Sequence, residues 1–266
     1  MIDYHIHTRL CRHAVGEIEE YAAKAKENRL LELGFADHFP LELLDANLKA
    51  DVTMSGNQLE GYIASILSLK AGTAGLVIKL GIEVDYLPGR ERITEKLIAS
   101  YPFDFVIGSI HFLAGWDFTN PANIKGFALK DAEKIYVDYF QLLKEMAAAD
   151  LFDIVGHADV VKKFGHLIDE EAAGEIRREA VAAIKKHGLC VEVNTSGWRA
   201  PVGEQYRSRS FLSDCFQRDI PVTLGSDAHS PGDVGKGFPE ALALLKEIGY
   251  DRLATFNKRK RSFIAL

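Results

Sequence analysis

Most of the histidines in this chain follow short apolar segments, and this pattern constrains the fold more than any other feature. Seven of the nine histidines, together with Glu83 and Asp227, come at or just after runs of β-type residues that alternate with longer helical patterns. The runs lie at residues 2–7, 33–36, 77–83, 105–111, 154–157, 189–194 and 222–225. Parallel strands need helical connections of this kind. The alternation therefore predicts seven strands of a parallel sheet.

The stretches between these runs have apolar residues at helical spacing. They lie at residues 17–27, 58–71, 129–148, 169–186, 207–218 and 239–248. Repeated strand–helix units form either an open sheet or a closed barrel, and only a closed ring brings all the strand ends together. Because polar residues follow nearly every predicted strand, we expect an α/β fold: one domain over residues 1–266, a distorted (β/α)7 TIM-like barrel with a metal site at the C-terminal ends of the strands. The least regular segment, residues 40–57, is either a lid or a plain surface excursion.

Composition limits the classes of function. A formal net charge of -6 produces no field that would attract a polyanion, so a small-molecule substrate fits better than nucleic acid. The chain starts with a predicted strand rather than a basic leader, and no segment approaches the ~18 apolar residues of a membrane helix. The three cysteines, Cys11, Cys190 and Cys215, lack the short paired spacing of a disulfide framework or a thiolate zinc site. We expect a cytoplasmic protein of undetermined oligomeric state.

His5 and His7 are two residues apart on a predicted strand, so both side chains point to the same face and can bind one metal ion. Other polar residues that follow predicted strands are Asp37, His38, Glu83, His111, His157, Asp227 and His229. Imidazole and carboxylate groups bind divalent cations, and several such ions held together can generate hydroxide and neutralise a phosphate near pH 7. Taken singly, each residue is equally well explained by capping or core packing. Taken together they predict a metal cluster, because a buried carboxylate such as Glu83 would cost several kcal/mol without a cation.

Three histidines do not directly follow a predicted strand. His166 and His187 have charged neighbours in helical or loop patterns, and we expect both to be solvated surface residues. His13 lies two residues after Cys11, beyond the first predicted strand, and either side chain could be a ligand. We favour His13, because the other expected ligands are imidazoles and carboxylates.

Several segments carry recognisable motifs: DYHIHT (3–8), ADH (36–38), GIEVDY (81–86), GSIHF (108–112) and SDAH (226–229). These resemble the polymerase and histidinol phosphatase (PHP) superfamily, over nearly the whole chain. Further segments are similar to its stand-alone histidinol-phosphate phosphatases: GSIHFL (108–113), GWDF (115–118), GHAD (156–159) and NTSGWR (194–199). The resemblance implies a metal-dependent phosphomonoesterase that hydrolyses L-histidinol phosphate to L-histidinol and phosphate in histidine biosynthesis.

The resemblance also implies a site for three divalent ions. The first ion would be held by His5, His7, Glu83 and Asp227, the second by Glu83, His111 and His157, and the third by His13, His38 and His229. Imidazole and oxygen ligands suit zinc, iron and manganese alike, so the sequence leaves the metal open. We take Glu83, Asp227 and His229 as catalytic as well as metal-binding residues. The proton donor for the leaving group stays unassigned among Asp37, Asp159 and a metal-bound water.

Basic side chains near the strand ends could complete a phosphate clamp. Arg199 is the strongest candidate, because its neighbours favour an ordered loop, whereas Lys162 and Lys163 are either phosphate contacts or solvated charges. Trp116 and Asp117 could hold the amino or imidazole end of the substrate. Core packing explains Trp116 equally well.

Two rival functions stay open. A nuclease or nucleotide phosphoesterase of the same superfamily would keep the cluster and change the substrate, although no polymerase or basic nucleic-acid module is attached. A metal-storing or regulatory binding protein without turnover would not need the candidate phosphate clamp. Hydrolysis of histidinol phosphate is therefore the principal hypothesis.

Overall fold

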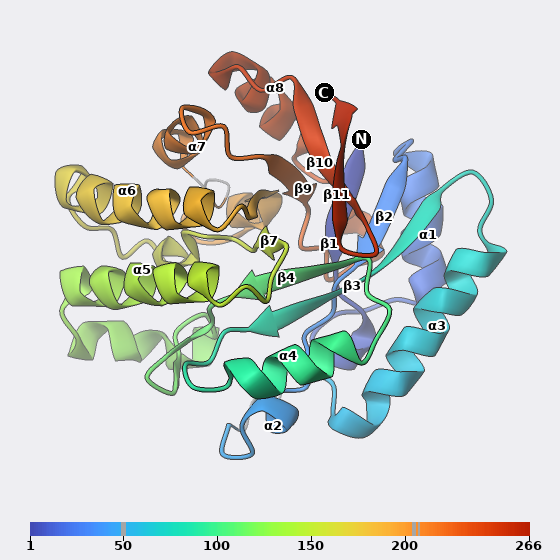
Figure 1. Cartoon of the computed structure of the whole chain (residues 1–266), viewed down its shortest axis with the longest axis horizontal. Coiled ribbons are helices and arrows are strands. Elements are labelled where there is room, and N and C mark those ends of the chain that lie inside the picture. Colours follow the sequence, from blue (N-terminus) through green and yellow to red (C-terminus); the bar gives the residue numbers. More distant parts are fainter. Residues whose placement is uncertain (49–51, 204–205, 207) are drawn as a thin grey trace.

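The computed structural model describes residues 1–48, 52–203, 206 and 208–266. Seven parallel strands form its central sheet in the order β1-β2-β3-β4-β7-β8-β9, which is also their order along the chain (Figure 1). They are β1 (Ile2–Ile6), β2 (Glu32–Phe35), β3 (Val77–Asp85), β4 (Phe105–Ser109), β7 (Ile154–Val155), β8 (Cys190–Asn194) and β9 (Val222–Gly225). The seven predicted strands are confirmed.

The two edges of this sheet meet just beyond β1 and β9. Ala228 follows β9, and its N–H donates to the His5 carbonyl at 3.2 Å while its own carbonyl accepts from the His7 N–H at 3.0 Å. The strands therefore form a nearly closed barrel. β7 has only two residues and the register between β1 and β2 is irregular, so the barrel is distorted. The expected distorted (β/α)7 barrel is confirmed.

Helices cover the outside of the barrel (Figure 1). They are α1 (Ile18–Glu27), α2 (Leu41–Leu44), α3 (Leu59–Gly72), α4 (Glu91–Ala99), α5 (Ala132–Ala148), α6 (Glu170–Lys186), α7 (Arg209–Phe216) and α8 (Phe238–Ile248). In α1, Tyr21, Ala22 and Ala25 are buried at helical spacing, and a capping box between Glu17 and Glu20 closes the first turn. The sequence pattern does not predict α2 or α4, which are short. No helix in the described ranges is long and apolar enough to cross a membrane.

Aromatic packing fills the barrel near the N-terminal ends of its strands. Tyr4 of β1 stacks on Phe105 of β4, with ring centroids 4.8 Å apart and an interplanar angle of 9°. A Cβ atom at Gly81 would lie 2.2 Å from the Phe105 ring, so only glycine leaves room for the ring at that position. This half of the barrel is closed by packing, which leaves the opposite mouth for polar groups.

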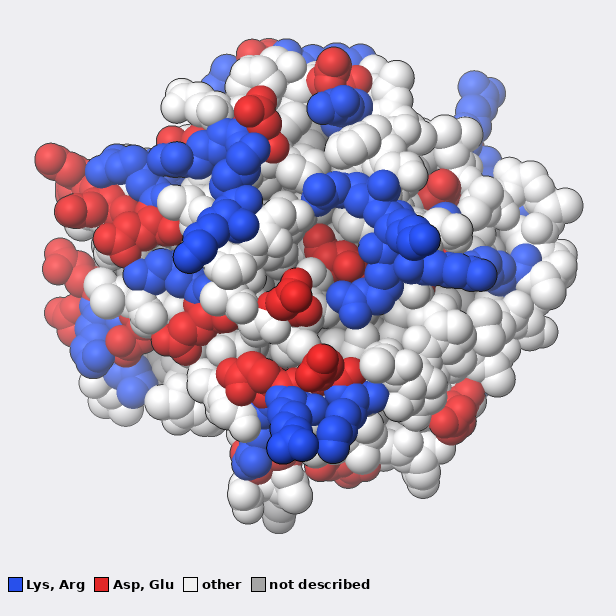
Figure 2. Space-filling view, viewed as in Figure 1, with Lys and Arg blue, Asp and Glu red and all other residues white. Residues whose placement is uncertain are grey.

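A C-terminal hairpin, not expected from the sequence, covers the N-terminal ends of the strands. β10 (Arg252–Asn257) pairs antiparallel with β11 (Lys260–Ala265). The Phe256 N–H donates to the Tyr4 hydroxyl at 3.1 Å, and Arg259 in the hairpin turn binds Asp153 at 2.9 Å. Lys and Arg side chains gather around this hairpin in Figure 2, while both signs of charge are mixed over the rest of that face.

Candidate metal centre

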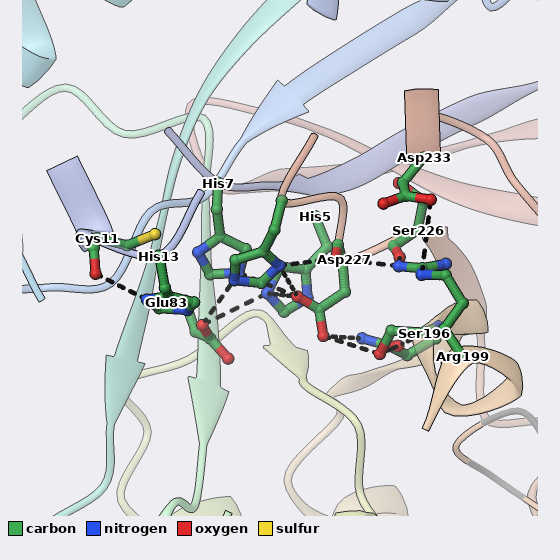
Figure 3. Close-up of polar contacts among 12 residues, drawn as sticks. His5, His7, Cys11, His13, Glu83, Ser196, Arg199, Ser226, Asp227 and Asp233 are labelled. Carbon is green, nitrogen blue, oxygen red and sulfur yellow. Dashed lines mark hydrogen bonds and ion pairs between the residues drawn. The ribbon is translucent and has the colours of Figure 1, made fainter. Parts of the chain in front are cut away.

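The expected ligands gather at the C-terminal mouth of the barrel. His5 lies in β1 and Glu83 in β3, and the other members of the cluster follow strands β1, β2, β4, β7 and β9: His7, His13, His38, His111, His157, Asp227 and His229. Ring centroids of neighbouring histidines are 4.1 to 6.3 Å apart. Figure 3 shows Glu83 and Asp227 pointing into this group of rings. The structure therefore brings every predicted metal ligand into one cluster.

Glu83 stands at the centre of the cluster. Its Oε1 lies 3.0 Å from His157 Nε2 and 3.7 Å from His111 Nε2. Its Oε2 lies 3.4 Å from His5 Nε2 and 2.8 Å from His38 Nδ1, the latter without the alignment of a hydrogen bond. Burial alone would raise the pKa of Glu83, but the charges of His38 and His5 hold that pKa well below its usual value. The carboxylate is ionised and can share its two oxygens between neighbouring cations.

Asp227 makes the second acidic contact of the cluster. Its Oδ1 lies 3.1 Å from His7 Nε2, and the Ser196 hydroxyl donates to its Oδ2 at 3.0 Å. The Asp227 backbone is left-handed, with a φ of 51°. Asp tolerates this conformation better than most residues, and such conformations gather at functional sites. The turn that completes the barrel at Ala228 thus also aims Asp227 at the histidines.

Two buried carboxylates orient ligand histidines from behind. His5 Nδ1 lies 2.6 Å from Glu192 Oε1, and His111 Nδ1 lies 2.9 Å from Asp85 Oδ1. Occupation of Nδ1 leaves Nε2 directed at the cluster, as metal-binding imidazoles are usually held. Glu192 also accepts the His157 N–H at 2.8 Å. Neither role was expected from the sequence, although Glu192 stands in the middle of a buried apolar strand, where a carboxylate needs a partner.

Two further histidines are fixed by main-chain carbonyls. His13 Nδ1 lies 2.7 Å from the Cys11 carbonyl, and His229 Nδ1 lies 3.0 Å from the Asp227 carbonyl. Because a carbonyl only accepts, Nδ1 carries the hydrogen and Nε2 the lone pair in both rings. Burial, together with the charge of His38, lowers the pKa of His13 to about 4. His13 is therefore neutral near pH 7, as a metal ligand must be.

Five buried polar atoms of the cluster have no hydrogen-bond partner within the described part of the chain. They are His5 Nε2, His7 Nδ1, Glu83 Oε2, His157 Nδ1 and His229 Nε2. Each such atom costs about 1–3 kcal/mol when it is left unpaired. Ligand atoms lie within 4.8 Å of one another in the sets His5–His7–Glu83, His38–Glu83–His111 and His7–His38–His229. The unpaired atoms of His5, Glu83 and His229 and the spacing of these sets fit divalent metal ions, which would supply the missing partners.

A cavity of about 830 Å³ opens over the cluster, and its lining includes Lys163, Arg199 and Asp117. Arg199 Nη2 donates to the Ser226 carbonyl at 2.7 Å and to the Asp227 carbonyl at 3.2 Å, which fixes the guanidinium beside a ligand. Burial lowers the pKa of Lys163 from its usual value. Besides the assigned metal ligands, the lining therefore holds two cations, Lys163 and Arg199, and three carboxylates, Asp85, Asp117 and Asp233.

Two of the predicted substrate contacts are not part of this lining among the described residues. Lys162 is buried, and its ammonium group binds Asp159 at 2.9 Å. Trp116 lies in the short hairpin of β5 (Phe112–Leu113) and β6 (Trp116–Asp117), packs edge-on against Phe127, and lines a neighbouring cavity of about 760 Å³. The structure favours core packing for Trp116 and an internal ion pair for Lys162, because these are the contacts that the two side chains make.

Other predictions have mixed outcomes. His187 is exposed, as expected, but the expectation of a solvated His166 was wrong: its ring is half-buried and stacks on Phe127, with centroids 4.4 Å apart.

Val52 and Thr53 line the cavity, so the segment at 40–57 reaches the site. Residues 49–51 of that segment lie outside the described residues. Its action as a lid stays a prediction.

Comparison with known families agrees with this site. The family model described as "PHP domain" matches residues 3–196. This chain belongs to the PHP domain family. A Deinococcus radiodurans protein named "Probable histidinol-phosphatase" is 39% identical to it over 262 residues, which cover 98% of each chain. The histidinol-phosphatase of Bacillus subtilis is 31% identical, over 89% of this chain and 96% of that protein.

A solved structure shares the PHP domain fold. It is a histidinol phosphate phosphatase from Lactococcus lactis, in complex with zinc, L-histidinol and phosphate. The two superpose with a TM-score of 0.82 over 98% of each chain, at 23% sequence identity. That likeness concerns the fold alone.

Proposed function

We propose that this PHP domain protein is a metal-dependent histidinol-phosphatase, which hydrolyses L-histidinol phosphate to L-histidinol and phosphate in histidine biosynthesis. One observation carries the proposal: the cluster of imidazoles and carboxylates lies under a cavity that also holds Lys163 and Arg199, in a chain 39% identical over its length to a protein with that name. We place the enzyme in the cytoplasm, where its three buried cysteines would stay reduced.

Three divalent ions, zinc, iron or manganese, fit the donor atoms of the cluster. We assign the first ion to His5, His7, Glu83 and Asp227, the second to Glu83, His111 and His157, and the third to His13, His38 and His229. When bound, such ions lower the pKa of water to about 7 and neutralise phosphate oxygens. Glu83, Asp227 and His229 would thus serve catalysis through the ions that they would hold. The protein contributes the fixed orientation of the imidazoles, through Glu192 at His5 and Asp85 at His111.

Arg199 and Lys163 are suited to the phosphate group. The Arg199 guanidinium is held by main-chain carbonyls through Nη2, and its Nε lies 3.8 Å from Asp233 Oδ1, which leaves Nη1 for phosphate oxygens. The Lys163 ammonium lies in the same lining and is partly removed from water, so a nearby anion would stabilise its charge. Together these side chains would orient the phosphorus above the cluster.

Asp117 is suited to the amino group of histidinol phosphate. The N–H groups of Thr119 and Asn120 each donate to its Oδ1 at 3.1 Å, so the carboxylate is held in one position. Apolar parts of the lining near it include Phe112 and Ile124, which could pack against an imidazole ring. A cationic amine therefore has a fixed acidic partner beside an apolar surface.

A substrate panel tests the function. With the metal-loaded protein, kcat/KM for L-histidinol phosphate should exceed that for nucleotides and for DNA ends by at least ~10²-fold, because histidinol phosphate combines a phosphate for Arg199 and Lys163 with a cationic amine for Asp117. Equal rates would favour the rival nuclease or nucleotide phosphoesterase. No release of phosphate from any monoester would favour a metal-binding protein without turnover.

Two variants separate the ends of the substrate. Asp117→Asn should lower kcat/KM for histidinol phosphate about 10–100-fold, because it removes a charge-assisted hydrogen bond, and should leave hydrolysis of phenyl phosphate unchanged. Arg199→Ala should lower kcat/KM for both substrates by a similar factor, because both carry the phosphate. Lys134→Ala is the matched control: Lys134 is exposed, binds Asp138 and lies outside the cavity over the cluster.

A further inference from the structure

Cys11 lies against the metal cluster, although its thiol has no place in the ligand set assigned above. Its side chain is fully buried, and its sulfur lies on the side of the histidines in Figure 3. The sulfur and one nitrogen each of His13 and His229 lie within 4.8 Å of one another. A second set with the same spacing joins Cys11 to His7 and Asp37. Cys11 is therefore surrounded by potential ligand atoms on two sides.

The turn that carries Cys11 fixes this position. Cys11 ends a short 3-10 helix (Arg9–Cys11), and its N–H donates to the Thr8 carbonyl at 3.1 Å. Arg12 then adopts a left-handed conformation, with a φ of 69°, which turns the chain so that the Cys11 carbonyl binds His13 Nδ1. The same turn therefore brings the Cys11 sulfur close to the His13 ring, whose Nε2 is left as the ligand atom.

Unpaired nitrogen atoms face the same region. His229 Nε2 is buried and has no hydrogen-bond partner within the described residues. His7 Nδ1 also makes no hydrogen bond there, and its nearest acidic atom is Asp37 Oδ1 at 3.6 Å. The buried lone pair of His229 Nε2, within 4.8 Å spacing of a buried sulfur and a nitrogen of His13, indicates a missing cation more than a packing role. Cys190 and Cys215 are equally buried, but neither belongs to any group of described residues with the spacing of metal ligands.

We propose that Cys11 is a thiolate ligand of the third metal ion, beside His13 and His229. On binding, the S–H bond is replaced by a sulfur–metal bond, and the proton is released to solvent. A thiolate is a softer ligand than an imidazole or a carboxylate, so this position prefers zinc or ferrous iron over manganese. The inference rests on the metal centre of the proposed function, but it does not depend on the identity of the substrate.

Cobalt is a spectroscopic probe of this ligand. The full-length protein, stripped of metal, is titrated with Co²⁺ alone, and we expect visible bands from bound cobalt together with a thiolate-to-cobalt charge-transfer band in the near ultraviolet. Cys11→Ser should keep the visible bands and lose the charge-transfer band. Cys190→Ser and Cys215→Ser are matched controls that should keep both. Charge transfer that survives Cys11→Ser, or cobalt bands without charge transfer in the wild-type protein, would overturn the inference while leaving the metal centre intact.

Failure of cobalt to bind at all would overturn the inference and the metal centre of the proposed function together. X-ray absorption of the zinc-loaded wild-type protein gives an independent readout: a sulfur neighbour at about 2.3 Å is expected, against about 2.0–2.1 Å for nitrogen alone. Competition between zinc and manganese should show at least ~10-fold weaker preference for zinc in Cys11→Ser. An unchanged preference, with the variant folded as judged by circular dichroism, would contradict a ligand role.

Discussion

Buried charges at the N-terminal ends of the strands form hydrogen bonds and ion pairs within the protein. At the C-terminal ends, several buried polar atoms have no hydrogen-bond partner among the described residues. Asp104, at the start of β4, accepts from Lys70 Nζ at 2.6 Å and from the Leu80 N–H at 2.9 Å. At the other mouth, His5 Nε2 and Glu83 Oε2 are buried and make no hydrogen bond within the described residues. The same kinds of side chain thus stabilise the fold at one end and are candidate metal ligands at the other.

This difference shows where the fold is stabilised and where it is used. The hairpin of β10 and β11 closes the N-terminal end with protein contacts, so substitutions there act on stability. The C-terminal end holds buried carboxylates and polar atoms without hydrogen bonds among the described residues, so we expect substitutions there to act on metal binding and activity. Separate effects of variants at the two ends would support this division, and mixed effects would break it.

The largest effect is expected at Glu83. Glu83→Gln keeps the size of the side chain but removes the charge that two cations would share, so kcat/KM for histidinol phosphate should fall at least ~10²-fold. The measurement is steady-state phosphate release after metal loading. Glu32→Gln is the matched control, because Glu32 binds Tyr4 and Lys79 at the N-terminal end. Equal losses in the two variants would break the comparison.

A smaller effect on the same end is expected at Glu192. Glu192→Gln should weaken metal binding about 10-fold. The Glu192 carboxylate orients the His5 ring and makes it a more basic ligand, and the substitution removes that negative charge. Metal content after dialysis against a chelator of known affinity measures the change. Activity at saturating metal should recover most of its wild-type value. Activity that stays low at saturating metal would mean that Glu192 has a role beyond orienting the ligand.

Sequence patterns predict the candidate ligands at the strand ends better than they predict the residues that orient those ligands. His5, His111 and His157 could be placed from short apolar runs, because a strand ends where its apolar run ends and a parallel barrel collects those ends. Glu192 could not be assigned in this way: its contact with His5 joins residues far apart in the chain, and no local pattern records it. The ion pair of Lys162 with Asp159 could not be assigned for a related reason, since the turn after the strand decides which way a side chain points.

The C-terminal hairpin was missed because its pattern is weak. β11 is exposed along most of its length, so the sequence from 260 to 265 lacks the alternation of a half-buried strand. The short helix α4 was missed because only two of its nine residues are buried. Both elements are recognisable only once the barrel gives them a surface to cover.

At the N-terminal end, Asp104→Asn should reduce stability without changing catalysis. Lys70 and the Leu80 N–H both donate to Oδ2, and the Lys258 N–H donates to Oδ1. In either orientation of the amide, at least one of these donors would face an N–H instead of an oxygen, which costs about 1–3 kcal/mol in the free energy of unfolding. Urea denaturation followed by circular dichroism measures the loss. The value of kcat/KM should stay within about twofold of wild type, because distant sites act independently. A large loss of activity in the folded variant would show that the two ends are coupled.

The smallest effect is expected on the outer strand of the hairpin. The Arg252 guanidinium lies over the Phe263 ring, 4.6 Å from its centroid, and both side chains are exposed. An exposed cation–π contact is worth about 0.5–1 kcal/mol. Phe263→Ala and Arg252→Ala should each lower the free energy of unfolding by about that amount, and the double variant should lower it by little more than either, because one contact is lost in all three. Metal content and kcat/KM should not change. Additive losses would instead mean that each side chain stabilises the hairpin through separate packing, and any change in metal content would show that the cap at one end influences the cluster at the other.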